Sequence, residues 1–320
     1  MKSRAGQYTV RSAVARFYLV VYAEMTPKSA QASMLISDDS HRDRECRDVT
    51  GNEETRPARA PGLGYLVPFL LVHVGAVMAL VQGASRTGVL LCATVFTLQG
   101  FGITAGYHRY FAHRSFRTSR AFQLVLAVLG TIAVQKGVLW WVAIHRRHHR
   151  HTDGPLDPHS PRDGFVWSHV GWFLSPQFDV TERHRVRDLA VYPELAWLDE
   201  HFVVPPVVLA CALALAFGAT GFLWGFCLPT VLSWHLTYAV NSLGHLHGTR
   251  RFATADDSRN GFLLALLTFG EGWHNNHHRR PGAARQGLLW WEVDLTYYAL
   301  RALAAVGVVW DVVEPERSGS

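Results

Sequence analysis

The sequence predicts an all-α integral membrane protein with four transmembrane helices and a cytosolic helical cap that holds a histidine-ligated di-metal site. Three observations lead to this fold class. Charged residues make up 18% of the 320 residues and apolar residues 49%, whereas a soluble domain usually carries about 25% charged residues. The Lys and Arg residues fall, with one exception, on one side of four long apolar stretches. Nine of the 18 histidines stand in spaced clusters on that same side.

Composition divides the chain into three parts. Residues 1–60 are polar, and the stretch 37–61 is rich in Asp, Arg, Glu and Thr, so we expect a disordered N-terminal segment. Residues 61–312 hold the long apolar stretches and are expected to form the membrane domain. Residues 313–320 would be a short C-terminal tail.

The four apolar stretches pair into two helical hairpins. Leu63–Gln82 and Gly88–Tyr107 are each about twenty residues long, nearly free of charge and separated by a short turn. A helix of that length crosses a hydrocarbon core of about 30 Å. Val203–Gly218 and Phe222–Val240 form the second pair, turned by residues 219–221.

Two further apolar segments are expected to lie on the membrane surface rather than cross it. Residues 119–139 include Arg120 and Lys136 close to their ends. Leu295–Val309 is amphipathic and contains Arg301. Cations in such places favour an interfacial helix.

The positions of the cations orient these helices. Every Lys and Arg lies in residues 1–61, 108–201 or 245–320 except Arg86, which lies in a hairpin turn. The positive-inside rule assigns such segments to the cytoplasm, so both termini and the clustered histidines are predicted to be cytoplasmic. The net charge of +6 is then explained by topology, and no nucleic-acid partner is needed. The four cysteines form no CxxC pair, which indicates reduced thiols rather than a disulfide framework.

The clustered histidines have the spacing of metal ligands. Two HxxHH runs each place three side chains on one helix face, because residues three and four apart are neighbours there. In an HxxxxH run the two side chains lie about 140° apart on an ideal helix. That helix must end or distort if both bind one metal. The nine candidate ligands are His108, His113, His145, His148, His149, His245, His274, His277 and His278.

Nine imidazoles predict a pair of redox metals. Imidazole suits zinc, copper, iron and nickel, but a structural zinc site closes with four ligands. Nine histidines supply four or five ligands to each of two metals, and beside a bilayer such a centre implies an oily substrate and dioxygen. Ligating imidazoles also need acceptors for their second N–H. The nearby candidate carboxylates are Asp153, Asp157, Glu271 and Asp294.

Longer motifs around these histidines carry a family resemblance. They are HRYFAH at 108–113, HRRHH at 145–149, DPH at 157–159, WSHVGW at 167–172, NSLGH at 241–245 and GEGWHNNHH at 270–278. In this order and spacing, residues 62–312 resemble the Δ9-type fatty acyl desaturases, a family that acts on acyl-CoA and acyl-lipid substrates. Segments 258–260 and 290–294 look most like the bacterial branch.

The resemblance implies two iron ions and a division of the ligands between them. One iron would be held by His108, His113, His145 and His274. The other would be held by His148, His149, His245, His277 and His278. Asn241 would position a metal-bound water on the first iron, and Trp141 would line a narrow tunnel for the acyl chain.

The implied reaction is O2-dependent insertion of a cis double bond, at Δ9, into a saturated acyl chain carried on CoA or a membrane lipid. Electrons would come from a separate donor, such as a ferredoxin, a cytochrome b5-like protein or a reductase. The double-bond position itself depends on tunnel length, which is a packing property.

The residues that hold a CoA head group differ from those of the animal acyl-CoA members. Those members carry an Arg-Asp pair before the second histidine run and basic residues after the SHVGW segment. Here the two places read Ala143-Ile144 and FLSP at 173–176. Either the substrate is a membrane lipid or other arginines replace the contact. The candidates are Arg146, Arg147, Arg150 and Arg162.

Two other functions fit parts of the pattern. Histidine-rich membrane hydroxylases of alkanes or lipids, and carotenoid oxygenases, share such histidine runs, but the NSLGH and GEGWHNNHH segments argue against them. A non-enzymatic membrane metal transporter or sensor would need ionisable residues along an ion path. His73 and His235 are the only ionisable side chains in the predicted spans, which is a weak path.

Overall fold

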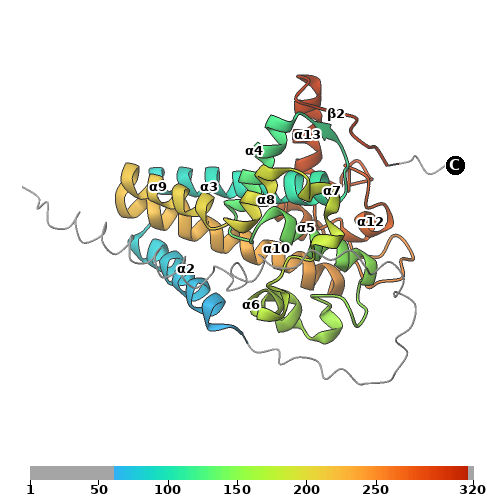
Figure 1. The fold of residues 1–320 in the computed structure, drawn as a ribbon, viewed down its shortest axis with the longest axis horizontal. Helices are drawn as coiled ribbons and strands as arrows, with labels where there is room; N and C mark the ends of the chain where they lie inside the picture. Colours follow the sequence, from blue (N-terminus) through green and yellow to red (C-terminus); the bar gives the residue numbers. More distant parts are fainter. Residues whose placement is uncertain (1–60, 316–320) are drawn as a thin grey trace, which may run out of the picture.

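The computed structural model describes residues 61–315, so the prediction for residues 1–60 and part of that for the tail lie outside the described residues. The described chain is almost entirely helical (Figure 1), in agreement with the expected class. A single short ladder stands apart within it: β1 (Arg117–Thr118) pairs antiparallel with β2 (Val309–Trp310), with Arg117 opposite Trp310.

Three stretches of helix are long and apolar enough to cross a membrane: Leu63–Gln82, Arg86–Ala112 and Val204–Leu246. The first is α2 (Leu63–Gln82), whose bounds are those predicted. The second joins α3 (Arg86–Phe101) to the π-helix η2 (Gly102–Ala112). The third consists of α9 (Val204–Phe222), the π-helix η7 (Leu223–Cys227) and α10 (Leu228–Leu246).

The third stretch folds back on itself at Gly218. The backbone there is not helical, with φ 62° and ψ −142°, a conformation that glycine adopts at little cost. Past this turn, a Cβ at Gly221 would lie 2.0 Å from the carbonyl oxygen of Leu213, so the turn is tight. After the turn the chain packs back on α9 through η7, the segment that leads into α10. The turn residue Gly218 stands one position before the turn predicted at residues 219–221.

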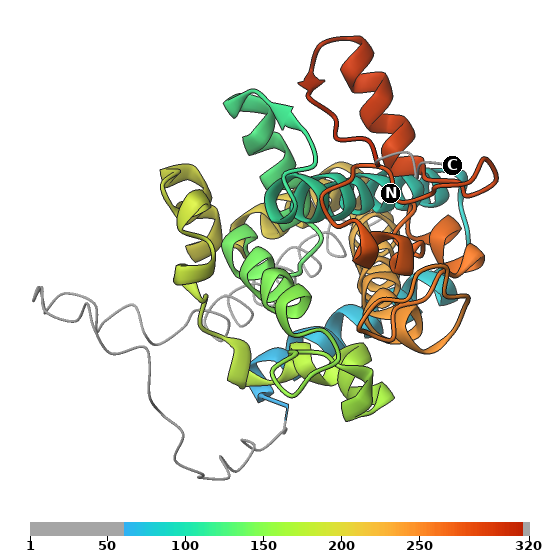
Figure 2. The same cartoon turned by 90° about the vertical axis from the view of Figure 1, so that its right-hand side faces the viewer.

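The remaining elements form a cap at one end of the long helices (Figure 2). The two segments expected on the membrane surface form helices, α4 and α13, and neither is of spanning length. The cap contains α4 (Arg120–Thr131), α5 (Val138–His151), η3 (Pro161–Asp163), η4 (Trp167–Gly171), α6 (Trp172–Leu174), η5 (Pro176–Phe178), η6 (Arg183–Arg185), α7 (Arg187–Ala190), α8 (Pro193–Glu200), α11 (Phe262–Leu267), α12 (His274–Arg279) and α13 (Leu295–Ala305).

Small residues let the cap pack closely on the membrane helices. A Cβ at Gly102 would lie 2.2 Å from the backbone of Leu129, and one at Gly130 would lie 2.2 Å from the ring of Tyr107. The backbones of η2 and α4 therefore approach each other as only glycine allows. This contact fixes η2, which carries the first candidate ligands.

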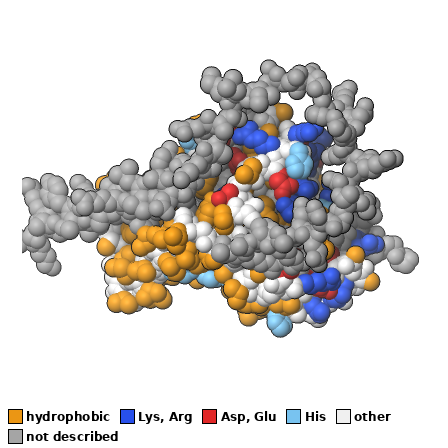
Figure 3. Space-filling view, turned by 60° about the horizontal axis from the view of Figure 1, so that its bottom comes forward, with side chains coloured by type: hydrophobic (Ala, Val, Ile, Leu, Met, Phe, Trp, Pro, Cys, Tyr) orange, Lys and Arg blue, Asp and Glu red, His pale blue; other side chains and the backbone are white. Residues whose placement is uncertain are grey.

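The surface separates into an apolar end and a charged end. Figure 3 shows hydrophobic side chains gathered over the end that carries the long helices, and Lys and Arg side chains at the other end. On α2, Leu70, Val74 and Val81 are 50%, 55% and 82% exposed. An apolar surface of this extent marks contact with lipid, so the protein is an integral membrane protein.

Candidate metal centre

The first two candidate ligands lie on a distorted helix, as their spacing required. His108 belongs to the π-helix η2, and the N–H of His113 donates to the carbonyl of His108 at 3.1 Å. Hydrogen bonds between residues five apart define a π-helix. Two side chains at that spacing therefore share a face, which they would not do on an ideal α-helix. The ring centroids of His108 and His113 are 4.8 Å apart.

The nine clustered histidines gather into two groups. The ligand nitrogens within each group lie within 4.8 Å of one another. The five-histidine cluster consists of His108, His113, His145, His149 and His277. The four-histidine cluster consists of His148, His245, His274 and His278.

The division implied by the resemblance is wrong for three residues. His149 and His277 lie in the five-histidine cluster, and His274 lies in the four-histidine cluster. The reason is helix geometry, because at about 100° per residue positions i and i+4 lie about 40° apart while i+3 points about 60° to the other side. Each HxxHH run therefore contributes its outer pair to one cluster and its middle histidine to the other.

The Nε2 atoms converge at the spacing of neighbouring metal ligands. The distance is 3.1 Å from His108 to His277, 2.8 Å from His113 to His145, and 3.0 Å from His245 to His274. Two nitrogens bound at right angles to one metal, each at about 2.1 Å, lie about 3 Å apart. The geometry of both clusters therefore fits a di-metal site.

Burial keeps these imidazoles in the form that binds metal. Burial, and then the neighbouring histidines, lower the pKa of His113, His145 and His149 well below its usual range. The pKa of His274 and His277 is lowered for the same reasons. A neutral imidazole is the ligand form, so the donor set matches soft or borderline divalent metals.

Three of the four candidate carboxylates accept from clustered histidines. The Nδ1 atoms of His148 and His245 lie 3.0 Å from Asp157 and Asp153 respectively. His108 Nδ1 lies 2.6 Å from Glu271. Burial would raise the pKa of Glu271, but His108 and Arg109 together lower it to about 2. A charged carboxylate on Nδ1 fixes the tautomer and leaves Nε2 free for a metal.

Asp294 does not contact a clustered histidine, which corrects the expectation from its position in the sequence. Its carboxylate lies 3.0 Å from the guanidinium of Arg109 and caps α13 by accepting from the N–H of Tyr297 in the first turn of that helix. Arg109 in turn lies 3.1 Å from Glu271. Asp294 therefore supports the site only through Arg109 and the carboxylate that Arg109 holds.

One carboxylate that contacts a clustered histidine was not predicted from the sequence. Asp256 lies 3.0 Å from Nδ1 of His278, in the loop between α10 and α11. It is 22 residues away in sequence, so no helix spacing links the two. The only signal available was the polar run Asp256-Asp257-Ser258 in the segment between two histidine motifs.

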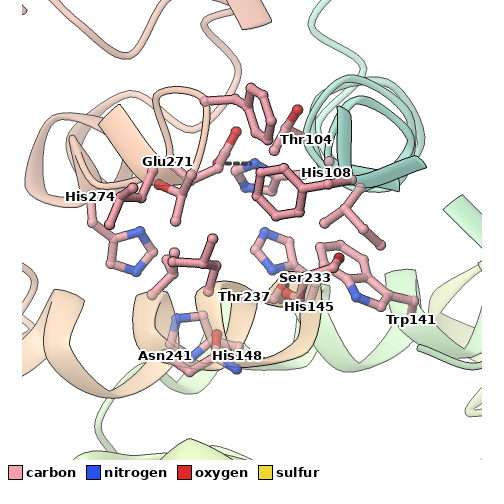
Figure 4. A pocket seen from close by; sticks show the side chains of 18 residues that line it. Thr104, His108, Trp141, His145, His148, Ser233, Thr237, Asn241, Glu271 and His274 are labelled. Atoms are coloured by element: carbon pink, nitrogen blue, oxygen red, sulfur yellow. Dashed lines mark hydrogen bonds and ion pairs between the residues drawn. The ribbon is translucent and has the colours of Figure 1, made fainter. Parts of the chain in front are cut away.

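A pocket with an apolar wall leads to the two clusters. It contains about 640 Å3 of space, part of it open to the surroundings. Its apolar lining includes Phe96, Ile103, Leu236, Val240 and Phe269. Figure 4 shows His108, His145, His148 and His274 around the same space.

The pocket is lined both by Trp141, predicted to line the acyl tunnel, and by Asn241, predicted to position a metal-bound water (Figure 4). Trp141 stacks on His145 with ring centroids 5.0 Å apart, and Asn241 lies one helical turn before His245 on α10. Gln135, which sequence reasoning missed, donates to Thr237 at 3.0 Å and accepts from Nε1 of Trp141 at 3.4 Å. This bridge holds Trp141 against α10 from across the pocket wall.

Comparison with known proteins agrees with this geometry. A family model described as fatty acid desaturase matches residues 84–312. The sn-2 palmitoyl-lipid 9-desaturase of Nostoc sp. (strain 36) is 40% identical over 224 residues, 68% of this chain and 79% of that protein. The sn-1 stearoyl-lipid 9-desaturase of Anabaena variabilis is 39% identical over 249 residues, 76% of this chain and 91% of that protein.

A plant relative carries a different substrate in its name. The acyl-CoA C20 Delta5-desaturase of Anemone leveillei is 38% identical over 230 residues, 70% of this chain and 73% of that protein. The family match covers the second and third of the three apolar stretches together with all nine clustered histidines. The chain belongs to the fatty acid desaturase family and is a membrane fatty acid desaturase.

Proposed function

We propose that this desaturase uses two iron ions and O2 to insert a cis double bond at Δ9 of a saturated acyl chain carried by a membrane lipid. The observation that carries the proposal is the pocket, because four clustered histidines and a long apolar wall line the same space. The names of the two bacterial relatives, both lipid 9-desaturases, support the position and the carrier.

The nine histidines are the residues that would hold the irons. When bound, the iron pair supplies the oxidising chemistry: two external electrons and two protons join O2, two adjacent methylenes lose two hydrogens, and two waters leave. The protein supplies neutral donors on one side and a dry apolar wall on the other. Asn241 lies at the pocket wall, one helical turn before His245 on α10, and is the residue we assign to a water beside the four-histidine cluster.

Positioning of the acyl chain falls to the Trp141, Gln135 and Thr237 bridge. These side chains project into the pocket wall at the level of His145. A bend of the chain around this bridge would bring one pair of methylenes beside the metals and fix the double-bond position. Holding the reacting atoms in place accounts for much of the rate that enzymes gain.

Pairing of three of the four candidate arginines favours a lipid over CoA. Arg146 lies 2.7 Å from Asp188, Arg147 lies 2.7 Å from Glu182, and Arg162 lies 2.8 Å from Asp257. An arginine already bonded to a carboxylate is a poorer site for a phosphate. Next to the pocket, α11 exposes Phe262 and Leu263 at 53% and 67%, a surface suited to lipid.

The proposed topology has four crossings, since the bent third stretch would cross the membrane twice. Both termini and the metal centre would face the cytoplasm, because the cations outside the apolar stretches lie on that side. Electrons would come from a separate donor, either a ferredoxin, a cytochrome b5-like protein or a reductase.

Expression in a desaturase-deficient host tests the proposal. We expect Δ9-monounsaturated chains in the membrane lipids, measured by mass spectrometry of separated lipid classes and acyl-CoA with double-bond localisation. Unsaturation that first appears in the acyl-CoA pool would overturn the lipid carrier. A hydroxylated product would support the alkane or lipid hydroxylase alternative, and zinc flux without O2 consumption would support the transporter alternative. Metal analysis of the purified protein, with about two irons per chain expected, tests the cofactor separately.

A further inference from the structure

A second histidine system lies outside the two clusters. His73 on α2, His235 on α10 and His169 on η4 are all half-buried. They come from segments far apart in sequence, and no spacing linked them. His235 precedes His245 by ten residues on α10, which is about 15 Å along a helix, so this system is separate from the metal centre.

The three imidazoles are joined end to end by hydrogen bonds, and we call them the histidine chain. Nε2 of His73 meets Nε2 of His235 at 2.9 Å, and Nδ1 of His235 meets Nε2 of His169 at 3.0 Å. Both ends of the histidine chain are bonded as well. The end contacts are His73 Nδ1 to the Phe69 carbonyl at 2.7 Å, His169 Nδ1 to Ser242 Oγ at 3.0 Å, and Ser242 Oγ to the Tyr238 carbonyl at 2.9 Å.

In its neutral form, the histidine chain has fewer hydrogen-bond donors than hydrogen-bond contacts. There are five contacts, and the carbonyls of Phe69 and Tyr238 at the two ends can only accept. Three neutral imidazoles supply one N–H each and the serine supplies one O–H, which makes four donors. A neutral chain therefore leaves two lone pairs facing each other at one contact. One added proton satisfies all five.

We propose that His73, His235 and His169 together bind one proton in excess of their neutral forms and share it along the chain. The added charge would convert neutral hydrogen bonds into stronger charge-assisted ones. It would also tie α2 and η4 to α10, the helix that carries His245. Ionisable residues within membrane helices generally pair with one another in this way.

Aromatic neighbours are suited to the added charge. The ring of Phe69 lies 4.2 Å from that of His73, and Phe165 stacks on His169 at 5.3 Å. Aromatic faces attract cations at such distances. Burial acts in the opposite direction, since desolvation lowers the pKa of His169, so the proposal requires the fifth hydrogen bond and the aromatic faces to outweigh burial.

No described carboxylate lies within ion-pair distance of the three rings. The titratable neighbours are Tyr238, whose ring contacts His169 and His235, and Cys227 of η7, which packs on α2 at Gly75. The helix η3 packs on η4 and α10 and carries Arg162, which pairs with Asp257, and Asp163. The proton of the histidine chain therefore does not come from an ion pair with a described residue.

Ser242→Ala tests the proton count without removing a histidine. It deletes the last two contacts, and three neutral imidazoles then suffice for the remaining three. We would compare the iron-loaded full-length protein and the variant in potentiometric titrations at matched iron content. At pH 8 ordinary histidines, with pKa values of about 6.5, are almost entirely neutral. We expect the wild type to hold about one more proton than Ser242→Ala at that pH.

Two further variants make the result decisive. His169→Phe also leaves a chain that neutral residues satisfy, so it too should hold about one proton fewer at pH 8. His201→Phe removes a half-buried histidine that lies outside the histidine chain and contacts the Trp197 carbonyl, and it should change nothing at pH 8. Equal proton binding by the wild type and both chain variants would overturn the proposal, whatever the enzyme's substrate is found to be.

Discussion

The two histidine clusters are held in place in different ways. In the four-histidine cluster, three of the imidazoles bond directly to carboxylates: His148 to Asp157, His245 to Asp153 and His278 to Asp256. In the five-histidine cluster only His108 does so, to Glu271, among the described contacts.

In the five-histidine cluster, arginines rather than carboxylates position most of the ligands. Arg109, next to His108, is 1% exposed and joins Glu271 to Asp294. Arg146, next to His145, donates to the carbonyl of Phe111 at 3.0 Å, two residues before His113. These contacts position the backbone that carries the ligands and leave most of the imidazoles without an anionic acceptor.

The difference predicts two metals with different surroundings. A carboxylate on Nδ1 makes an imidazole a stronger donor, so a metal in the four-histidine cluster would sit in the more electron-rich field. The five-histidine cluster has more ligands but depends on helix positions for its geometry. Substitutions in the two clusters should therefore have different consequences.

Removing a ligand from either cluster should have the largest effect. His148→Ala and His277→Ala each take one imidazole from a different cluster, and desaturation needs both metals. We expect each variant to insert into the membrane and to lose at least about 100-fold in activity, in keeping with the weight of metal ligation in such sites. Product analysis by mass spectrometry and iron content per chain measure the outcome. Retained desaturation in both variants would refute the ligand assignment, and His201→Ala serves as the control.

Neutralising a carboxylate sharpens the comparison. Asp157→Asn keeps an oxygen near His148 but removes the charge, and the loss of such a partner lowers metal affinity by about 10- to 100-fold. Glu271→Gln should do the same for the five-histidine cluster, and it should also lower the thermal unfolding midpoint, because Arg109 loses one of its two carboxylates. Chelator competition measures the affinity. An equal lowering of the unfolding midpoint by Asp157→Asn and Glu271→Gln would contradict the asymmetry.

Much of the fold followed from the sequence because membrane helices are recognised by local composition. The bounds of α2 were predicted to the residue, and the turn residue Gly218 is the last residue of the first predicted arm of the second hairpin. The distortion at His108 and His113 also followed from spacing alone, because no ideal α-helix brings residues five apart onto one face.

The features that the sequence did not predict are tertiary contacts between segments far apart in the chain. Spacing within one HxxHH run separates its outer pair from its middle histidine, but which pair joins which middle histidine depends on how α5 and α12 face each other across the site. Asp256 and the contact between His73 and His235 join segments that meet only in the folded chain. Asp294 is near the histidine motifs in sequence, but in the structure its carboxylate bonds to Arg109 and not to a clustered histidine.

Removing the carboxylate that pairs with Arg146 beside the five-histidine cluster should have the smallest effect on stability, and this effect should depend on pH. Burial would raise the pKa of Asp188, but hydrogen bonds from Arg146 and Arg114 lower it to about 2, from an ordinary 3.8. Because the folded-state pKa is lowered, the stabilisation is present above pH 3.8 and is lost as the pH falls toward 2. The Asp188 side chain is 27% exposed, so screening leaves about 1 kcal/mol of this stabilisation.

Asp188→Asn should therefore lower the thermal unfolding midpoint at pH 7 and have a smaller effect at pH 3, close to the range in which the wild-type carboxylate itself becomes neutral. Metal-stripped protein should be used at both pH values, so that loss of metal on histidine protonation does not enter the comparison. Asp311→Asn is the matched control, because its pair with Arg117 is exposed at 63% and 76% and such pairs contribute little. Two results would mean that the Asp188 pair does not contribute and that Arg146 supports the five-histidine cluster through backbone carbonyls, among them those of Phe111 and Ala112. One is a difference between wild type and Asp188→Asn that is unchanged at pH 3. The other is a difference at pH 7 no larger than that of Asp311→Asn.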